Sequence, residues 1–216
     1  MAARDYGQYS GITRAMELVG ERWALLIVRD LLVGPRRYGE LAAGLPRIPS
    51  NILAARLKEL QAAGILRRAP RSRVIVYELT PYGRELEPVV LALGAWGFKA
   101  MGDPREEQII TPDSMTMDLR SAFRPQVAAE LPPTAYGARF GAADLLIRVD
   151  GTALDVRRGD GPVDLAFAAG PGIRRLISGE LAPERAIATG VVEVLRGRGD
   201  LLGRFADTFH LAAGRP

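Results

Sequence analysis

The 216-residue sequence contains no cysteine. Disulfides, thiolate metal sites and thiol redox sensing are therefore excluded for these residues. The single histidine, His210, cannot form a histidine metal cluster. Its context, "DTFHLAAG", does not show the partners that a Ser-His-Asp triad needs. We expect His210 to pack at a helix end, and we predict no metal site and no cofactor.

Long apolar runs are also missing. No stretch reaches the roughly 18 residues of a membrane-spanning helix, and "MAARDYGQYS" has no apolar signal core. A hydrophobic content of 48% with 25% charged residues is ordinary for a globular protein. We therefore expect a cytoplasmic protein without membrane contact, long enough for one good core or two small ones.

Lysine is scarce and the charge is unevenly distributed. Lys58 and Lys99 are the only lysines among 29 basic residues. Residues 1–100 hold 15 basic and 9 acidic residues, a net charge of +6, whereas residues 101–216 hold 14 and 16, a net charge of −2. This division favours a nucleic-acid module followed by a unit with another task.

The first hundred residues predict a winged helix-turn-helix. Helical patterns occur in "GITRAMELVG", "RWALLIVRDLLVG", "RRYGELAAGL" and "PSNILAARLKEL", with Gly64 ending the last of these helices. The strand-like segments "ILRRA" and "VIVYELT" follow, separated by "PRSR". Thr80-Pro81 begins a further helix, expected to run from Pro81 to about Met101. Residues 1–101 are the predicted DNA-binding and dimerisation domain.

The helix in residues 49–60 has the two faces of a recognition helix. Leu53, Leu57 and Leu60 form a stripe that would be buried, while the opposite face carries small or adaptable side chains. Such a face can approach base edges closely, and asparagine can pair with adenine through two hydrogen bonds. The alternative is that Ser50 and Asn51 only cap the helix. Arg56, on the flank, fits either role.

The hairpin after this helix concentrates arginines around one turn. A hairpin tip beside a recognition helix can reach the minor groove or the phosphates, although a solvated basic loop is the alternative. The predicted DNA-binding residues of helix and wing together are Arg37, Ser50, Asn51, Ala54, Ala55, Arg56, Lys58, Arg67, Arg68, Arg71 and Arg73.

At residues 8–98 the sequence resembles the HxlR-type winged-helix transcriptional regulators of bacteria. The most specific segments are "RWALLIVRDLLVGPRRYGEL", "LAARLKELQAAGIL" and "YELTPYGREL". The resemblance implies a homodimer that binds an inverted repeat, with dimer contacts from the N-terminal helix and the helix after the wing. Many relatives carry a cysteine just before the first helix, used in some for redox sensing. Ser10 stands at the matching position here.

The second half has a different pattern. Residues 102–133 are predicted as a linker with one possible helix, "MTMDLRSAF". Short strands then alternate with turns at Gly141-Ala142, Asp150-Gly151 and Gly159-Asp160-Gly161, followed by helices, a last strand and an amphipathic helix. Residues 134–216 therefore predict an α+β domain, an antiparallel sheet with packed helices.

Residues 134–210 resemble the sterol-carrier-protein-2-like (SCP2-like) fold through "LISGELAPERAIATG", "VVEVLRGRGDLLGRF" and the Asp150-Gly151 hairpin. The resemblance implies a space for lipids or other apolar ligands between sheet and helices. The predicted lining residues are Leu145, Ile147, Phe167, Leu176, Ile177, Val192, Val194 and Phe205. The alternative is that these side chains pack on one another as a solid core.

These patterns predict a dimeric bacterial transcription factor that binds double-stranded DNA. Its second domain either senses an apolar small molecule or braces the dimer. Two other functions remain open: a lipid-carrier module whose winged helix contacts protein, and an architectural DNA binder without operator choice. No set of carboxylates, nucleophile and base converges in the sequence, so we do not predict an enzyme.

Overall fold

The computed structural model describes residues 5–102, 105 and 107–212. The chain divides into two compact units, residues 1–90 and 91–216. The division falls within helix α6 (Glu87–Phe98), which therefore belongs to both units. In the part of the chain that the structure describes, no helix combines the length and the apolar character needed to cross a membrane.

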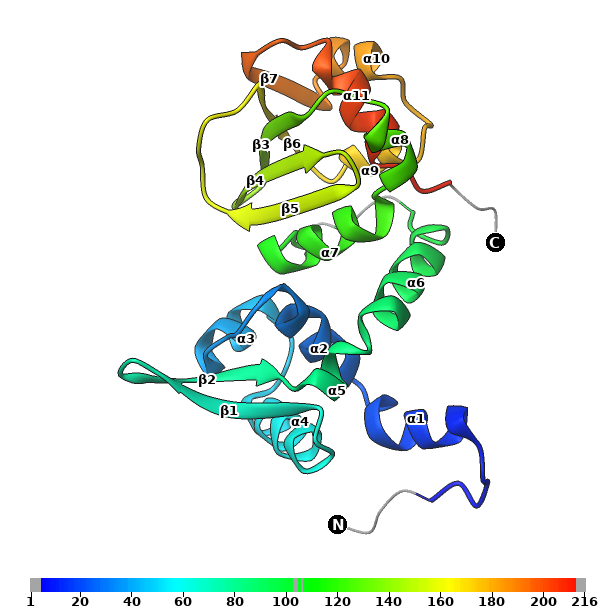
Figure 1. Cartoon of the computed structure of the whole chain (residues 1–216), viewed down its shortest axis with the longest axis vertical. Coiled ribbons are helices and arrows are strands. Elements are labelled where there is room, and N and C mark those ends of the chain that lie inside the picture. Colours follow the sequence, from blue (N-terminus) through cyan, green and yellow to red (C-terminus); the bar gives the residue numbers. More distant parts are fainter. Residues whose placement is uncertain (1–4, 103–104, 106, 213–216) are drawn as a thin grey trace. The chain divides into compact units, whose positions relative to one another are not determined.

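The first unit is a winged helix-turn-helix (Figure 1). Its helices are α1 (Gly11–Val19), α2 (Ala24–Val33), α3 (Tyr38–Gly44) and α4 (Ser50–Ala62). The expected end of α4 is confirmed, because Gly64 directly follows the cap residue and adopts the left-handed conformation with φ +71°. The antiparallel strands β1 (Leu66–Arg71) and β2 (Val74–Leu79) form the wing.

The helix expected from Pro81 to Met101 is broken in the structure. Its start is confirmed, since the Thr80 hydroxyl accepts a hydrogen bond from the Gly83 N–H at 3.1 Å. However, α5 (Pro81–Arg84) ends one turn later and α6 begins at Glu87. Pro88 explains the break, because proline has no N–H to donate to the carbonyl of Arg84 and its ring crowds that position.

The second unit contains a five-stranded sheet in the order β5-β4-β3-β6-β7. Its strands are β3 (Thr134–Phe140), β4 (Ala143–Asp150), β5 (Ala153–Arg158), β6 (Leu165–Ala169) and β7 (Val192–Gly197). Its further helices are α7 (Pro112–Ala122), α8 (Pro125–Ala129), α9 (Ile173–Ile177), α10 (Pro183–Ala188) and α11 (Leu201–Thr208). The strands and helices expected from residue 112 onward are confirmed, and only α8 was not expected.

The expectation of a purely antiparallel sheet was wrong at one pair of strands. β3 and β6 are parallel neighbours, with Tyr136 opposite Leu165. The chain leaves β5 at the sheet edge and crosses the sheet through residues 159–164 before it enters β6. Val163 in this crossover lies against Gly137, where an added Cβ would be 3.6 Å from either Val163 methyl. Hairpin turns join antiparallel strands, so the parallel pairing of β3 with β6 requires a crossover connection of this kind.

One face of the sheet and the helices enclose a single apolar core. All five helices from α7 to α11 contribute buried side chains to it, as do all five strands. The segment predicted as a linker, residues 102–133, contributes through α7 and α8, whose Leu119 and Ala128 are buried there. Asp103, Pro104 and Glu106 of that segment lie outside the described residues.

Gly83 offers a test of the packing in the first unit. A Cβ at this position would lie 2.0 Å from the backbone carbonyl oxygen of Ile65, which no side-chain rotation can relieve. We expect Gly83→Ala to lower the free energy of unfolding by about 3 kcal/mol, measured by urea titration. Gly39→Ala in α3 is the control, because its Cβ meets nothing within 4 Å. It should stabilise by up to about 1 kcal/mol, and equal effects would contradict the packing argument.

Candidate nucleic-acid interface

Helix α4 is held by one face and free on the other. Leu53, Leu57 and Leu60 are buried, as the sequence predicted. The exposed residues include Ser50, Asn51, Ala54 and Lys58, while Ala55 is half-buried. A helix fixed in this way presents a small, polar surface at a defined orientation, which is what close approach to base edges requires.

The first turn of α4 does not use its polar side chains for capping. Pro49 is the cap residue, and no side-chain hydrogen bond caps this helix. Across the described residues, the side chains of Ser50 and Asn51 make no hydrogen bond to protein groups. The capping alternative for these two residues therefore has no support in the geometry. Both side chains are exposed and available to an external partner.

A tyrosine connects the two helices of the helix-turn-helix. The Tyr38 hydroxyl, in the first turn of α3, donates a hydrogen bond to the Ser50 carbonyl oxygen at 2.8 Å. This bond positions the start of α4 relative to α3. Sequence reasoning missed Tyr38, because nothing in the sequence signals a contact between two positions that are 12 residues apart. Arg37, immediately before α3, is exposed, as a DNA-contacting residue must be.

Arg56 lies in an internal ion-pair network. Its guanidinium is 3.1 Å from the Glu21 carboxylate and also pairs with Glu59, one turn further along α4. Only 12% of the side chain is exposed. Of the two roles open to Arg56, this geometry favours bracing α4 against the loop that contains Glu21.

The wing is a tight hairpin whose arginines differ in their surroundings. Arg67 pairs in register with Glu78, and a two-residue turn at Ser72 and Arg73 joins the strands. Ser72 adopts φ +56°, the left-handed conformation at the first turn position that such hairpins use. Figure 1 shows this hairpin extending beyond the helices of the first unit.

Glu78 neutralises part of the wing's charge. Its carboxylate accepts hydrogen bonds from Arg67 Nε and from an Arg71 terminal nitrogen, both at 2.8 Å. The Arg71 and Arg67 guanidinium groups hold the pKa of Glu78 below its usual value. Only 8% of the Glu78 side chain is exposed, against 65% for Arg67. Glu78 therefore fixes the two guanidinium groups side by side on one face of the ribbon.

The sequence analysis considered the charges of the four wing arginines but did not include the Glu78 carboxylate. The signal was present, since a two-residue turn places Glu78 directly opposite Arg67. The remaining pair behaves differently: Arg68 and Arg73 are exposed, and neither makes an ion pair with any residue that the structure describes. The free positive charge of the wing is therefore concentrated on Arg68 and Arg73.

Comparison with known proteins agrees with this geometry. Residues 18–104 match the model of the HxlR-like helix-turn-helix family. The HTH-type transcriptional regulator YvaP of Bacillus subtilis is 37% identical over 86 residues, which are 38% of this chain and 80% of that protein. The chain belongs to the HxlR-like helix-turn-helix family.

Further relatives match the same region of the chain. The HTH-type transcriptional regulator Rv3095 of Mycobacterium tuberculosis is 42% identical over 96 residues, 43% of this chain, and the match spans only 60% of that regulator. The crystal structure of quinone-bound YodB from Bacillus subtilis is 37% identical, with 40% of this chain and 93% of that chain covered at a TM-score of 0.36. The family match ends at residue 104, before the sheet of the second unit begins.

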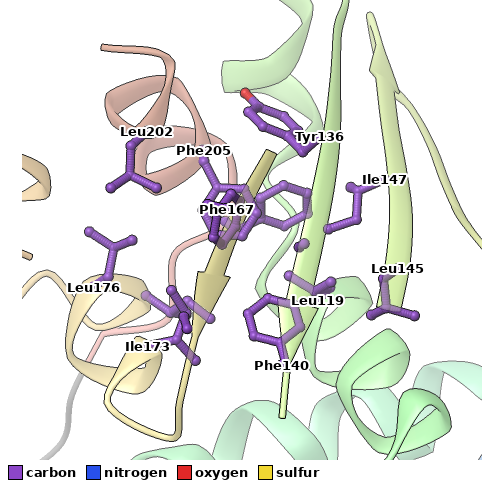
Figure 2. Packing of buried hydrophobic residues seen from close by; sticks show 14 of the residues in the cluster. Leu119, Tyr136, Phe140, Leu145, Ile147, Phe167, Ile173, Leu176, Leu202 and Phe205 are labelled. Carbon is purple, nitrogen blue, oxygen red and sulfur yellow. The ribbon is translucent and has the colours of Figure 1, made fainter. Parts of the chain in front are cut away.

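In the second unit, the eight predicted ligand-lining residues lie mostly in the filled core. All except Val194 are buried, and Val194 packs against the same cluster. The ring centroids of Phe167 and Phe205 are 5.1 Å apart, and Tyr136 meets Phe205 edge-on at 5.4 Å. Figure 2 shows these side chains occupying the space between sheet and helices. This packing is the solid-core alternative that the sequence left open.

Titratable groups in the described part of the chain do not gather into a metal site. No group of three histidine or acidic side chains is placed to hold a metal ion there. His210 is half-buried after α11, and its backbone N–H donates to the Ala122 carbonyl oxygen at 2.8 Å. Burial raises the pKa of Tyr136 to about 12, so this core hydroxyl stays protonated at neutral pH.

The two kinds of wing arginine predict different salt effects. Replacing Arg68 and Arg73 together by alanine should weaken binding to any duplex DNA and reduce the slope of log affinity against log salt by about 1.8, about 0.9 for each phosphate that is no longer neutralised. Fluorescence anisotropy over a salt series measures this slope. The paired substitution Arg148→Ala with Arg196→Ala, exposed arginines of the second unit, should leave it unchanged. An unaltered slope in the wing variant would mean that these arginines stay in solvent.

Proposed function

We propose that this protein is a DNA-binding transcriptional regulator that recognises an inverted-repeat operator as a homodimer. The observation that carries the proposal is helix α4. Its leucine face is buried, while the side chains of Ser50 and Asn51 are exposed and make no hydrogen bond to described protein groups. The family membership and the names of the relatives as transcriptional regulators support the same function. A protein that regulates transcription in a bacterium works in the cytoplasm.

Base recognition in this proposal rests on the first two turns of α4. Asn51 pairs with adenine, and Ser50 donates or accepts a hydrogen bond at a neighbouring base. Ala54 and Ala55 allow the backbone to approach the groove and contact a thymine methyl. Lys58, one turn further, meets a phosphate. Arg37, Arg68 and Arg73 supply further backbone or minor-groove contacts, whereas Arg56, Arg67 and Arg71 act through their internal ion pairs.

Exposed apolar residues support the homodimer. Helix α6 has almost no polar residue, yet Val89, Leu93 and Trp96 lie on one exposed side at helical spacing. The Trp96 side chain is 72% exposed. Ile12 and Met16 form a similar exposed pair on α1. Apolar surfaces of this kind are typical of association sites, and a second copy of the chain fits the twofold symmetry of an inverted repeat.

For the second half we propose an SCP2-like domain, residues 134–216, joined to the DNA-binding domain, residues 1–101, by residues 102–133, whose helices α7 and α8 pack into its core. A sheet with one face covered by helices supports this assignment. The domain either responds to an apolar small molecule or braces the dimer. Without cysteine, thiol oxidation is excluded as its signal. Neither the sequence nor the described residues favour catalysis, so the proposal contains no enzymatic step.

Two other candidate functions predict a different DNA-binding behaviour. A lipid-carrier module whose winged helix contacts protein would not bind DNA even at low salt. An architectural binder would bind operator and random duplexes equally at physiological salt. The exposed Asn51 favours a regulator with sequence preference, because a purely architectural interface needs no base-reading side chain. Genome-wide DNA pulldown with the purified protein would identify the operator.

Asn51→Ala should reduce specificity more than overall affinity. A bidentate contact between asparagine and adenine is worth about 1–3 kcal/mol of discrimination against the wrong base. The operator should therefore bind about 5- to 150-fold more weakly, while random DNA is little affected. Competition binding measures both. Gln61→Ala, exposed near the end of the same helix, is the control. Equal weakening of both DNAs would show that Asn51 reads no base.

Trp96→Ala should weaken the dimer. Truncating an interface tryptophan typically costs about 2 kcal/mol or more, so the dimer dissociation constant should rise by about 30-fold. Sedimentation equilibrium measures this constant, and cooperative operator binding should disappear with the dimer. Leu195→Ala removes an exposed apolar side chain from β7 and should change neither. Wild-type self-association in the Trp96 variant would contradict the proposed interface.

A further inference from the structure

The second unit contains a cavity outside its aromatic core. Its volume is about 440 Å³, and it is lined by the end of α6, the segment that follows it, α7 and α9. Ligand pockets in proteins typically measure 300–1,000 Å³. Among the predicted ligand residues, only Ile177 lines this cavity. The cavity is therefore distinct from the space between sheet and helices that the SCP2-like resemblance suggested.

The walls of the cavity are mainly apolar. Buried side chains from three different helices form them: Phe98 of α6, Met115 of α7, and Ile173 and Ile177 of α9. Met101, after α6, also lines the space and is exposed. Apolar walls with an accessible edge favour a compact apolar body that enters from solvent, and the two methionines can adapt to its shape.

Two arginines and one aspartate are among the residues that line the cavity. Arg174 is held by Glu180 through two hydrogen bonds of 2.9 and 3.0 Å, so this pair is neutral overall. Asp118 also lines the cavity and has a partner of its own. Arg105 is exposed, and its guanidinium has no ion-pair partner among the residues that the structure describes. Arg105 is therefore a cation of the lining that remains open to an anionic ligand.

We propose that this cavity binds a small organic carboxylate with a compact apolar body. The apolar part occupies the space between Phe98, Met115 and Ile173, and the carboxylate pairs with Arg105. The proposal deepens the proposed regulatory function by naming the site and the chemical class of its effector. The uncharged lipids that the SCP2-like resemblance implies do not match this site, because they carry no negative charge to pair with the Arg105 guanidinium.

The position of the cavity suggests how its occupant acts on the dimer. Phe98, in its wall, lies two residues after Trp96 on α6. Another residue of this helix, Gly94, comes so close to α7 that an added Cβ would lie 2.8 Å from Ser121 Oγ. A molecule between α6 and α9 therefore biases the position of a helix whose exposed side carries the proposed dimer contact. Couplings of this kind typically change affinity by about 5- to 150-fold.

Binding is tested directly on the full-length protein without DNA. Isothermal titration calorimetry compares 2-naphthoate with its uncharged amide, and octanoate with 1-octanol. We expect each acid to bind and its neutral partner to bind at least about tenfold more weakly. If the neutral compounds bind as tightly as the acids, the assignment of a carboxylate is overturned.

Two substitutions at the rim locate the site. Ala100→Trp places a large ring in the cavity from an exposed position, and Arg105→Ala removes the free charge. Ala100→Trp should abolish binding of 2-naphthoate, and Arg105→Ala should weaken it at least about tenfold. Matched controls lie at a separate cavity of about 540 Å³ that is lined by residues of β3, β4, β6 and β7. There, Leu195→Trp and Arg196→Ala should leave binding unchanged, and a loss of binding in these controls instead would overturn the assignment.

The proposed effect of the ligand on DNA binding is tested by measuring operator affinity. Saturating 2-naphthoate should change operator affinity of the wild-type protein by about 5- to 150-fold, and this change should be absent in Ala100→Trp. Binding of the acid without any change in operator affinity would overturn the effector role. The Asn51→Ala variant separates the two proposals, because it should bind 2-naphthoate like wild type even if its DNA recognition fails.

Discussion

Burial of the leucine face of α4 is the constraint on which the rest of the DNA-binding unit depends. Leu53, Leu57 and Leu60 remove the rotational freedom of the helix, so its opposite face has one orientation. The hydrogen bond from Tyr38 to the Ser50 carbonyl positions the N-terminal end of the same helix. The base contact that we propose for Asn51 requires a helix fixed in this way, since a misplaced donor cannot discriminate between bases.

Several arginines of this unit are held in ion pairs within the protein. Glu21 and Glu59 hold Arg56, and Glu78 holds Arg67 and Arg71. Mutual repulsion among the wing arginines is reduced in the absence of DNA, because a mostly buried carboxylate lies between two of them. Arg68 and Arg73 remain as solvated cations that a phosphate backbone can attract. The net charge of the first half therefore overstates the charge that is available to DNA.

In the second unit, the packed core and the proposed ligand cavity are formed by different regions. Aromatic contacts around Phe205 fill the space between sheet and helices, and such a core contributes stability without leaving room for a ligand. The cavity proposed as an effector site lies instead beside Phe98, where α6 enters the unit. In the proposed arrangement the packed core supports the unit, and the small molecule binds beside the apolar helix α6.

Local patterns in the sequence determined most elements of both units and the two faces of α4, because hydrophobic periodicity and turn residues act over a few positions. They also indicated the family through "RWALLIVRDLLVGPRRYGEL". Tertiary structure alone decided which arginines are free, that β6 pairs in parallel with β3, and that Leu145 and Phe205 belong to a filled core. These outcomes depend on contacts between residues far apart in the chain. Core and pocket linings have the same composition, so only the packed geometry distinguishes them.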